Sequence, residues 1–160
     1  LDLGSGPMND ARCLVSTGFG HITAVDSNQV PEDILNNFPE GKVSFILSSF
    51  ESFNFHKGRY DLVNAQYSLP FSPPETFKSV IKAIQLSLKN GGVFVGQFYG
   101  ERDYKSKNEK YMTFLTRTEA EDLLTDFRIV SFTEVESDIK TVMSGNKIEH
   151  CHIFDFTVVK

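Results

Sequence analysis

The sequence has few cysteines and no long hydrophobic run, and each shortage excludes a class of protein. Cys13 and Cys151 are its only cysteines and form no CxxC pair, so neither a disulfide scaffold nor a redox motif is expected. Reduced thiols of this kind are typical of a cytoplasmic protein. No stretch approaches the roughly 20 apolar residues of a membrane-spanning helix, so no membrane partner is expected.

Basic residues are also scarce. The 160 residues include 16 Lys and Arg against 21 Asp and Glu, which gives a formal net charge of −5. Such a chain has no broad cationic surface to neutralise a phosphate backbone, so nucleic acid is not expected as a partner.

Length and composition indicate one domain over residues 1–160, because the composition does not drift along the chain. No signal peptide is visible, but the chain starts at Leu1, inside what reads as a first strand. We therefore expect an N-terminal truncation that leaves the first strand, and any helix before it, incomplete. Nothing in the sequence indicates the oligomeric state.

The first ten residues, LDLGSGPMND, place the end of an apolar strand directly against a glycine-rich turn. Gly4 and Gly6 lack a Cβ, which lets the backbone take positive φ and come close to a bound group. The helix expected from about Asn9 to Thr17 presents free N–H groups at its N-terminus. This arrangement favours a carboxylate or a phosphate as ligand.

A second apolar run, residues 21–25, ends in Asp26, which lies 20 residues after Gly6. In a strand–turn–helix–strand unit, an acid at about this distance ends the second strand and binds both hydroxyls of a ribose. Turn, helix, strand and acid in this order favour a cofactor that contains a nucleoside. The alternative is an ordinary tight turn followed by an acid that faces solvent.

Four segments resemble class I S-adenosylmethionine-dependent methyltransferases. They are LDLGSG (residues 1–6), AVD (24–26), YDLVNAQYSLPF (60–71) and LKNGGVFVGQF (88–98). The last is the most characteristic, because a helix that ends in a Gly-Gly break before an apolar strand is the family's usual entry to its fifth strand. Within the family, the chain is most similar to small bacterial, tellurite-resistance-like or small-molecule methyltransferases.

This resemblance implies a doubly wound, Rossmann-like three-layer α/β sandwich, with a mostly parallel sheet and an antiparallel C-terminal strand beside the fifth. It also implies S-adenosyl-L-methionine as the cofactor. The residues expected to bind it are Asp2, Gly4, Ser5, Gly6, Asp26, Ser27, Ser49, Phe50, Asn64, Ala65 and Tyr67. The family usually has an acid where Ser49 stands and often a third glycine where Met8 stands. Glu51 either substitutes for that acid or is a solvated loop residue.

Apolar patterns place the remaining elements of the first two thirds of the chain. They are a short helix from Pro31 to about Phe38, a buried strand at 42–47, strands at 60–65 and 93–98, and a helix opened by Pro73-Pro74 and capped by 89–92. The polar stretch 99–110 that follows is either a lid or a solvated connection. As a lid, it would bring Arg102, Asp103, Tyr104 and Tyr111 to the substrate.

The last third of the chain predicts a helix and a closing hairpin. A capping box at residues 118–121 begins the helix, which carries Leu123, Leu124 and Phe127 inward. The runs 128–136 and 152–160 are rich in β-formers and are separated by a polar segment with no room for a crossover helix, so they pair antiparallel. His150-Cys151-His152 contains three potential metal ligands. Side chains of alternating strand residues do not readily converge on one metal ion, so no metal site is assigned.

The chemistry is expected after the fourth strand, at residues 64–71, where an open α/β sheet binds its ligands. Asn64-Ala65-Gln66-Tyr67 resembles the Asn-Pro-Pro-Tyr motif of amino-group methyltransferases but lacks both prolines. Tyr67 and Phe71 either present aromatic faces to a sulfonium or simply line the site.

No catalytic residue is assigned, because methyl transfer from a sulfonium mainly needs an acceptor held in line. His152, Tyr67 and Asp103 are conceivable general bases. The leading hypothesis is methyl transfer to a small molecule. The alternatives are a binding module of the same fold that does not turn over, and a nicotinamide dehydrogenase, which requires parallel last strands.

Overall fold

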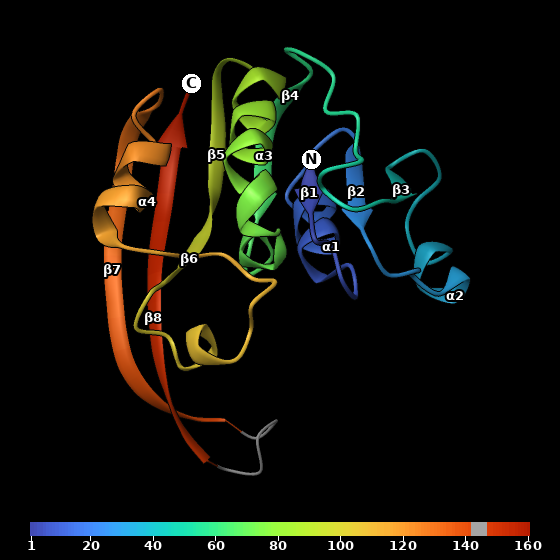
Figure 1. Ribbon diagram of the computed structural model, residues 1–160. Helices are drawn as coiled ribbons and strands as arrows, with labels where there is room; N and C mark the ends of the chain where they lie inside the picture. The colour runs from blue at the N-terminus through green and yellow to red at the C-terminus, as the bar shows by residue number, and fades with distance from the viewer. Residues whose placement is uncertain (142–146) are drawn as a thin grey trace.

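The computed structural model describes residues 1–141 and 147–160. Its centre is one sheet with the strand order β3–β2–β1–β4–β5–β8–β7, and the short β6 also pairs with β5 (Figure 1). The strands are β1 (Asp2–Leu3), β2 (Ile22–Asp26), β3 (Val43–Leu47), β4 (Tyr60–Ala65), β5 (Leu88–Gly100), β6 (Phe114–Leu115), β7 (Arg128–Thr141) and β8 (Lys147–Val159).

Strands β1 to β6 pair in parallel, whereas β8 is antiparallel to both β5 and β7. The strand order reverses between β1 and β4, because β2 and β3 lie on one side of β1 and β4 and β5 on the other. In an open α/β sheet, ligands bind outside the carboxyl ends of the strands at such a reversal. The predicted doubly wound sheet with an antiparallel C-terminal strand is confirmed.

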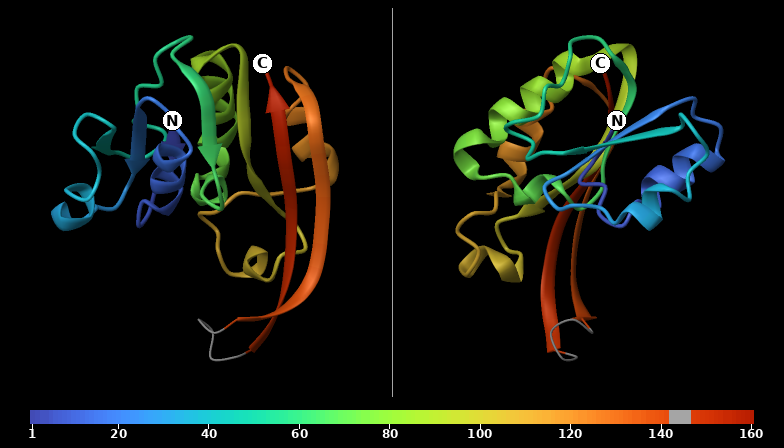
Figure 2. Two further views of the ribbon diagram at one scale, coloured as in Figure 1. Left: turned by 180° about the vertical axis from the view of Figure 1, so that it is seen from behind. Right: turned by 90° about the vertical axis from the view of Figure 1, so that its right-hand side faces the viewer.

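Helices cover both faces of this sheet (Figure 2). The helices α1 (Asn9–Ser16) and α2 (Glu32–Leu35) lie on one face, and α3 (Pro74–Ser87) and α4 (Arg117–Leu123) lie on the other. Two short 3-10 helices, η1 (Leu69–Phe71) and η2 (Tyr104–Lys107), follow β4 and β5. Within the described residues, no helix is long and apolar enough to cross a membrane.

The larger core lies under α3 and α4 and is aromatic. Phe94, Phe98, Phe154 and Phe156 of β5 and β8 are buried in it, with the rings of Phe98 and Phe156 4.5 Å apart. Buried aromatic rings contribute much of a core's stabilisation, so these contacts fix the register of β5 against β8. A smaller cluster around Met8 lies on the α1 side of the sheet.

Two strand predictions need correction. The strand at residues 42–47 is not buried: Ile46 and Leu47 are 39% and 55% exposed, because β3 is an edge strand of the sheet. The fifth strand is also longer than predicted, since Leu88 already pairs with Tyr60 and the strand continues to Gly100. The predicted helix cap at 89–92 and the start of the predicted polar loop therefore belong to β5.

The capping box of α4 begins two residues earlier than predicted. Thr116 is the N-cap, and its hydroxyl accepts a hydrogen bond from the N–H of Glu119, whose carboxylate accepts one from the N–H of Thr116 at 2.8 Å. Thr118 and Glu121 have the same spacing. The structure uses the first pair because Leu115 is held in β6 against β5, so the chain turns into the helix directly after it.

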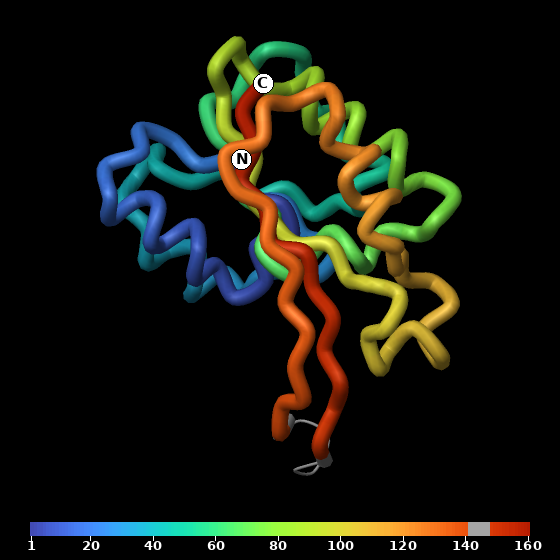
Figure 3. The backbone as a smooth tube through the Cα atoms, turned by 90° about the vertical axis from the view of Figure 1, so that its left-hand side faces the viewer, coloured from blue at the N-terminus to red at the C-terminus, as the bar shows by residue number. Residues whose placement is uncertain are grey.

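The predicted antiparallel pairing of the last two strands is confirmed, and both strands are longer than expected. β7 and β8 pair from Arg128 with Val159 to Thr141 with Lys147, which includes much of the predicted polar connection. The rest of that connection, residues 142–146, lies outside the described residues. β8 pairs with β5 only from Ile153 onward, so the hairpin projects beyond the carboxyl end of β5 (Figure 3).

Candidate functional site

A cleft of about 320 Å³ lies at the carboxyl ends of the strands that flank the reversal in strand order. Its walls come from Gly4 after β1, residues 26–28 at the end of β2, residues 48–51 after β3, and residues 66–68 and 71–72 after β4. Small-molecule pockets have volumes of about 300–1,000 Å³, so this cleft can hold one small ligand. Its position is the one that this class of sheet uses for binding.

The glycine-rich turn after β1 is attached to the end of β2 by backbone hydrogen bonds. The N–H groups of Gly4 and Ser5 both donate to the carbonyl oxygen of Val25, at 2.8 and 3.1 Å. The N–H of Gly6 donates to Oδ2 of Asp26 at 2.8 Å. The turn and the acid that were predicted to share one ligand are therefore in direct contact.

The two glycines of the turn have different surroundings. Gly4 has a φ of +74°, and a Cβ there would lie 2.2 Å from the Cβ of Ser68. Ser68 is held in place because its hydroxyl donates to the carbonyl oxygen of Leu3 at 2.6 Å. Gly6 has a φ of +45°, and a Cβ there would meet nothing within 4 Å. Gly4 is thus required by packing, whereas the open side of Gly6 lets a ligand approach the backbone.

Asp26 is 8% exposed, and its carboxylate organises the end of β2. Oδ1 accepts hydrogen bonds from the backbone N–H and the side-chain amide of Asn28, at 2.8 and 3.2 Å, while Oδ2 accepts from Gly6. A carboxylate has about four lone-pair sites, so these bonds leave acceptor capacity. Because Asp26 also lines the cleft, that capacity is available to the hydroxyl groups of a ligand.

A buried polar pair, Asp2 and Asn64, lies behind the turn. Nδ2 of Asn64 donates to Oδ1 of Asp2 at 2.9 Å and to Oδ2 of Asp10, in the first turn of α1, at 3.0 Å. Burial raises the pKa of Asp2 to about 6, although the hydrogen bond from Asn64 opposes this rise. Oδ2 of Asp2 has no hydrogen-bond partner among the described residues. Such an oxygen is destabilising unless a donor from a bound molecule or water reaches it.

The structure divides the predicted cofactor residues into two groups. Those that line the cleft are Gly4, Asp26, Ser27, Ser49, Phe50 and Tyr67. Those that are not part of its described lining are the buried Asp2, Ser5, Asn64 and Ala65 and the half-buried Gly6. The hydroxyl of Ser5 is buried without a partner in the described part of the chain, and Ala65 belongs to the hydrophobic core. Their contacts with a cofactor stay predictions.

Several other residues of the cleft were not predicted from the sequence. They are Asn28, Ser48, Gln66, Ser68 and Ser72, whereas Phe71, which the sequence did place at the site, lines the cleft. Ser48 and Gln66 directly follow a strand that the sequence did indicate, and Gln66 and Ser68 lie in the segment 64–71 where the chemistry was expected, so their position was the available signal. Glu51, which the sequence left open as a substitute acid, lines the cleft close to Ser49 along the chain.

The segment after β4 carries a strained residue at the wall of the cleft. Tyr67 has a φ of +51°, which non-glycine residues seldom adopt outside functional sites and tight turns. Its N–H donates to Oε1 of Gln97 on β5 at 2.8 Å, and this bond helps hold the unusual conformation. The ring of Tyr67 is left 55% exposed.

Of the conceivable general bases, Tyr67 lines the cleft, and His152 and Asp103 do not. His152 is fully buried, and its ring lies so close to Gly100 that a Cβ there would be 2.0 Å from Nδ1. Asp103 is 3% exposed and accepts hydrogen bonds from the N–H groups of Lys105 and His152. Both side chains therefore fix the fold next to the hairpin.

The polar segment after β5 is attached to the wall of the cleft. The N–H and hydroxyl of Thr113 donate to the carbonyl oxygens of Pro70 and Ser72, each at 2.8 Å. None of the proposed lid contacts, Arg102, Asp103, Tyr104 and Tyr111, is part of the described lining. Tyr111 is instead 83% exposed.

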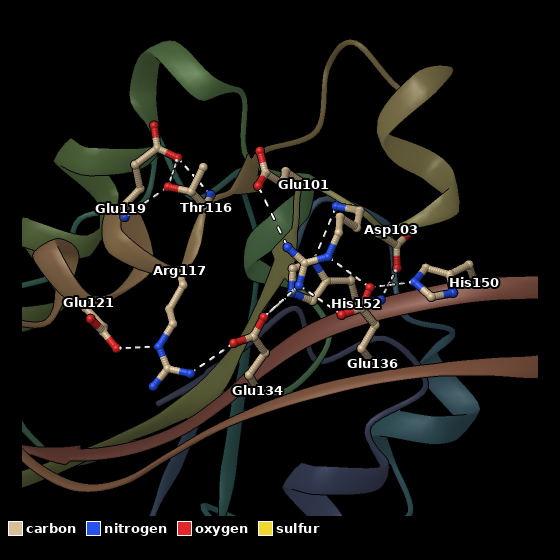
Figure 4. Close-up of polar contacts among 11 residues, drawn as sticks. Glu101, Asp103, Thr116, Arg117, Glu119, Glu121, Glu134, Glu136, His150 and His152 are labelled. Carbon is tan, nitrogen blue, oxygen red and sulfur yellow. Dashed lines mark hydrogen bonds and ion pairs between the residues drawn. The ribbon is translucent and has the colours of Figure 1, made fainter.

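A second polar cluster lies where the β7–β8 hairpin meets this segment (Figure 4). Nε2 of His152 lies 2.9 Å from Oε1 of Glu134, and Glu134, Glu136 and His152 offer ligand atoms within 4.8 Å of one another. The guanidinium of Arg102, however, donates to both carboxylates at 2.9 Å. It holds the pKa of Glu136 down to about 2, with help from a hydrogen bond of His150. A guanidinium thus takes the place that a metal ion would need.

Together, the reversal in strand order, the glycine-rich turn and the acid that ends β2 define a Rossmann-like ligand site. Comparison with known families gives a match to the methyltransferase domain family over residues 1–92, which is more than half of the chain. The chain belongs to this family, and the resemblance to class I S-adenosylmethionine-dependent methyltransferases that its sequence showed is confirmed. No curated protein matches the chain.

Solved structures of the same fold cover 99% of this chain. The 1,6-didemethyltoxoflavin-N1-methyltransferase of Burkholderia thailandensis, solved with 1,6-didemethyltoxoflavin and S-adenosylhomocysteine, is 22% identical, with a TM-score of 0.74 and 69% of its own chain covered. TehB of Haemophilus influenzae is 16% identical, with a TM-score of 0.81 and 57% covered. The [4+2]-cyclase SpnF is 15% identical, with a TM-score of 0.75 and 73% covered. At these identities the likeness shows the fold alone, and this fold carries more than one reaction.

Proposed function

We propose that this protein binds S-adenosylmethionine in the cleft and transfers its methyl group to a small molecule. The hydrogen bond between Gly6 and Asp26 carries the proposal, because it joins the turn and the acid at the reversal in strand order. In this arrangement Asp26 accepts hydrogen bonds from the ribose hydroxyls, and Ser49 and Phe50 contact the adenine. The turn and the N-terminus of α1 receive the carboxylate of the methionine part.

Two buried atoms near the turn support this assignment. Oδ2 of Asp2 and Oγ of Ser5 lack hydrogen-bond partners among the described residues. Asp2 can accept a hydrogen bond from an ammonium group or from a water that bridges to it, and the hydroxyl of Ser5 can donate to a carboxylate. The amino acid part of the cofactor has both groups. The chemistry of these residues therefore fits the cofactor.

The reaction requires no nucleophile from the protein, whose residues only position the reactants. The bound cofactor supplies an activated methyl group on a sulfonium. The protein must hold the acceptor in line with that methyl group and keep water away from it. Tyr67 and Phe71 are 55% and 61% exposed at the cleft, so a bound acceptor can cover both rings. Aromatic faces next to a sulfonium are attracted to it by about 0.5–2 kcal/mol.

Two observations support a small acceptor. The cleft of about 320 Å³ must also take the cofactor, which leaves room only for a small acceptor, and the net charge of −5 gives no cationic surface for a nucleic acid. In addition, the Burkholderia enzyme of the same fold was solved with 1,6-didemethyltoxoflavin bound. We infer that the acceptor of this protein is of similar size.

A turnover assay tests the proposal. The protein is incubated with S-adenosylmethionine and a panel of phenols, carboxylic acids, amines and nitrogen heterocycles, and S-adenosylhomocysteine is measured by mass spectrometry. Product formation that depends on one acceptor class, and that is lost in Asp26→Ala, is the expected result. If S-adenosylmethionine binds but no acceptor gives product, the protein is better described as a binding module.

A further inference from the structure

Two glutamine side chains and one backbone amide form a chain of hydrogen bonds beside the cleft. Gln97 of β5 is 6% exposed, and its Oε1 accepts from the N–H of Tyr67 at 2.8 Å. Its Nε2 donates to Oε1 of Gln66. Gln66 is the first residue after β4 and lines the cleft.

The backbone determines the orientation of both amides. The N–H of Tyr67 can only donate, so the Gln97 atom that meets it must be the carbonyl oxygen. The amide nitrogen of Gln97 then faces Gln66, which must offer its own carbonyl oxygen, because an amide nitrogen does not accept hydrogen bonds. The NH2 group of Gln66 therefore takes no part in this chain of hydrogen bonds. It forms no hydrogen bond to another of the residues that the structure describes.

We propose that this NH2 group of Gln66 selects the methyl acceptor, which must carry a hydrogen-bond acceptor such as a carbonyl oxygen or a ring nitrogen lone pair. The inference rests on the proposed function, since it assigns the substrate side of the same cleft. Gln66 recognises the substrate, and Gln97 is a positioning residue that acts through it. A molecule that turns an N–H toward Gln66 places two hydrogen-bond donors against each other. We expect it to bind about tenfold more weakly than a molecule of similar size that offers a hydrogen-bond acceptor there.

The carboxylate of the cofactor has the same chemistry as such an acceptor. Two features favour the substrate over the cofactor carboxylate as the partner of this NH2 group. The turn and the N-terminus of α1 already offer N–H donors to the cofactor carboxylate. Gln66 also directly precedes Tyr67, whose exposed ring lies at the cleft without a protein partner over most of its surface.

The substitution Gln97→Glu tests the orientation without changing a residue that contacts the substrate. A carboxylate at position 97 still accepts the hydrogen bond of the Tyr67 N–H, but it has no donor for Gln66. Gln66 then turns its NH2 group to the carboxylate and presents its carbonyl oxygen to the cleft. Gln66→Glu is a second variant with the same effect, because Gln97 can still donate to one carboxylate oxygen while the other faces the cleft.

The probes are quinoline, which has only a hydrogen-bond acceptor, and indole, which has only a donor. Their dissociation constants are measured by NMR titration on protein saturated with S-adenosylhomocysteine, whose own affinity is measured first by calorimetry. The native protein is expected to prefer quinoline about tenfold, and both variants are expected to lose or reverse this preference. Their affinity for S-adenosylhomocysteine should stay within about twofold of the native value, because the donors at the turn remain.

Failures of the two proposals are distinguishable. If the native protein does not bind S-adenosylhomocysteine, the proposed function fails. If it does, but quinoline and indole bind equally or the variants keep the native preference, the assignment of Gln66 is overturned. A loss of about tenfold or more in S-adenosylhomocysteine affinity in either variant also overturns it, since Gln66 would then serve the cofactor carboxylate.

Discussion

The backbone N–H of Gly6 donates a 2.8 Å hydrogen bond to the carboxylate of Asp26, although 20 positions separate them in the chain. This bond brings the end of β2 against the glycine-rich turn after β1. A single ligand can therefore contact both, which is the condition for a nucleoside site at this edge of the sheet.

The contact between Gly4 and Ser68 makes Gly4→Ala strongly destabilising. The new Cβ would lie 2.2 Å from that of Ser68, at a φ of +74°. Overpacking costs about 1–3 kcal/mol and a positive φ adds about 1 kcal/mol, so we expect a loss of about 2–4 kcal/mol in the free energy of unfolding. Urea unfolding measures it.

Gly6→Ala is the matched control for this substitution. A Cβ there meets nothing within 4 Å, so only the backbone conformation opposes it, at about 1 kcal/mol. The double variant Gly4→Ala/Ser68→Gly should recover only part of the lost stability, because it removes the clash but also the hydrogen bond from Ser68 to Leu3. Equal destabilisation by the two alanine substitutions would contradict this assignment.

The buried carboxyl of Asp2 should make stability depend on pH. Its pKa in the folded protein is about 6, above the ordinary value of 3.8, so the folded state binds the proton more tightly than the unfolded state. The stabilisation that this proton provides is fully present below about pH 3.8 and is lost as the pH rises through about 6. The difference in pKa corresponds to a free energy on the order of 3 kcal/mol.

Asp2→Asn is expected to abolish this dependence. As the pH rises, the native protein loses this stabilisation and the variant does not. The free energy of unfolding of Asp2→Asn minus that of the native protein should therefore increase by up to about 3 kcal/mol between acidic and weakly basic buffer. Denaturant unfolding across that range measures the change. Asp33→Asn, at an exposed position of α2, is the control and should leave the profile unaltered. A constant gap between Asp2→Asn and the native protein would show that Asp2 has an ordinary pKa.

The pKa of Glu136 should depend on Arg102. The guanidinium of Arg102 donates to both oxygens of Glu136 at 2.9 Å, and the pKa of that carboxyl lies at about 2 instead of 4.5. In Arg102→Met we expect the pKa to rise, but not fully to 4.5, because His150 also donates to Glu136. The stability that the depressed pKa contributes is present above about 4.5 and is lost as the pH falls toward 2.

NMR titration of the side-chain carboxyl carbons measures this pKa directly. Lys82→Met, which removes an exposed pair with Asp126 on another part of the surface, is the control and should not move it. If Glu136 kept a pKa near 2 in Arg102→Met, His150 alone would account for the depression.

Much of the fold could be predicted from the sequence because its signals are local. The glycine-rich turn, the run that ends in Asp26 and the helix opened by Pro73-Pro74 each need only neighbouring residues to be recognised. The burial of β3 could not be predicted, because an apolar run such as Phe45 to Leu47 looks the same in an edge strand and in a central one.

The site was predicted less completely than the fold, since its contacts join distant residues. Gln97 and Gln66 are 31 positions apart, and although each lies in a segment that resembles the family, neither segment indicates that the two side chains are in contact. Likewise, the burial of His152 follows from its contact with Gly100 on the neighbouring strand, which no spacing rule reveals. Some residues that follow a strand, such as Ser27 and Ser49, were predicted to be in the site, whereas contacts that depend on packing between strands were not.

Calorimetric titration with S-adenosylhomocysteine tests the central claim most directly. The native protein is expected to bind it in a one-to-one complex, and Asp26→Ala to bind it about tenfold to a hundredfold more weakly, because hydrogen bonds to a charged group contribute about 1.5–3 kcal/mol. Asp26→Asn keeps one acceptor oxygen and should fall between them, with circular dichroism showing that both variants are folded. Absence of binding to the native protein, or equal affinity in Asp26→Ala, would contradict the placement of the cofactor at this cleft.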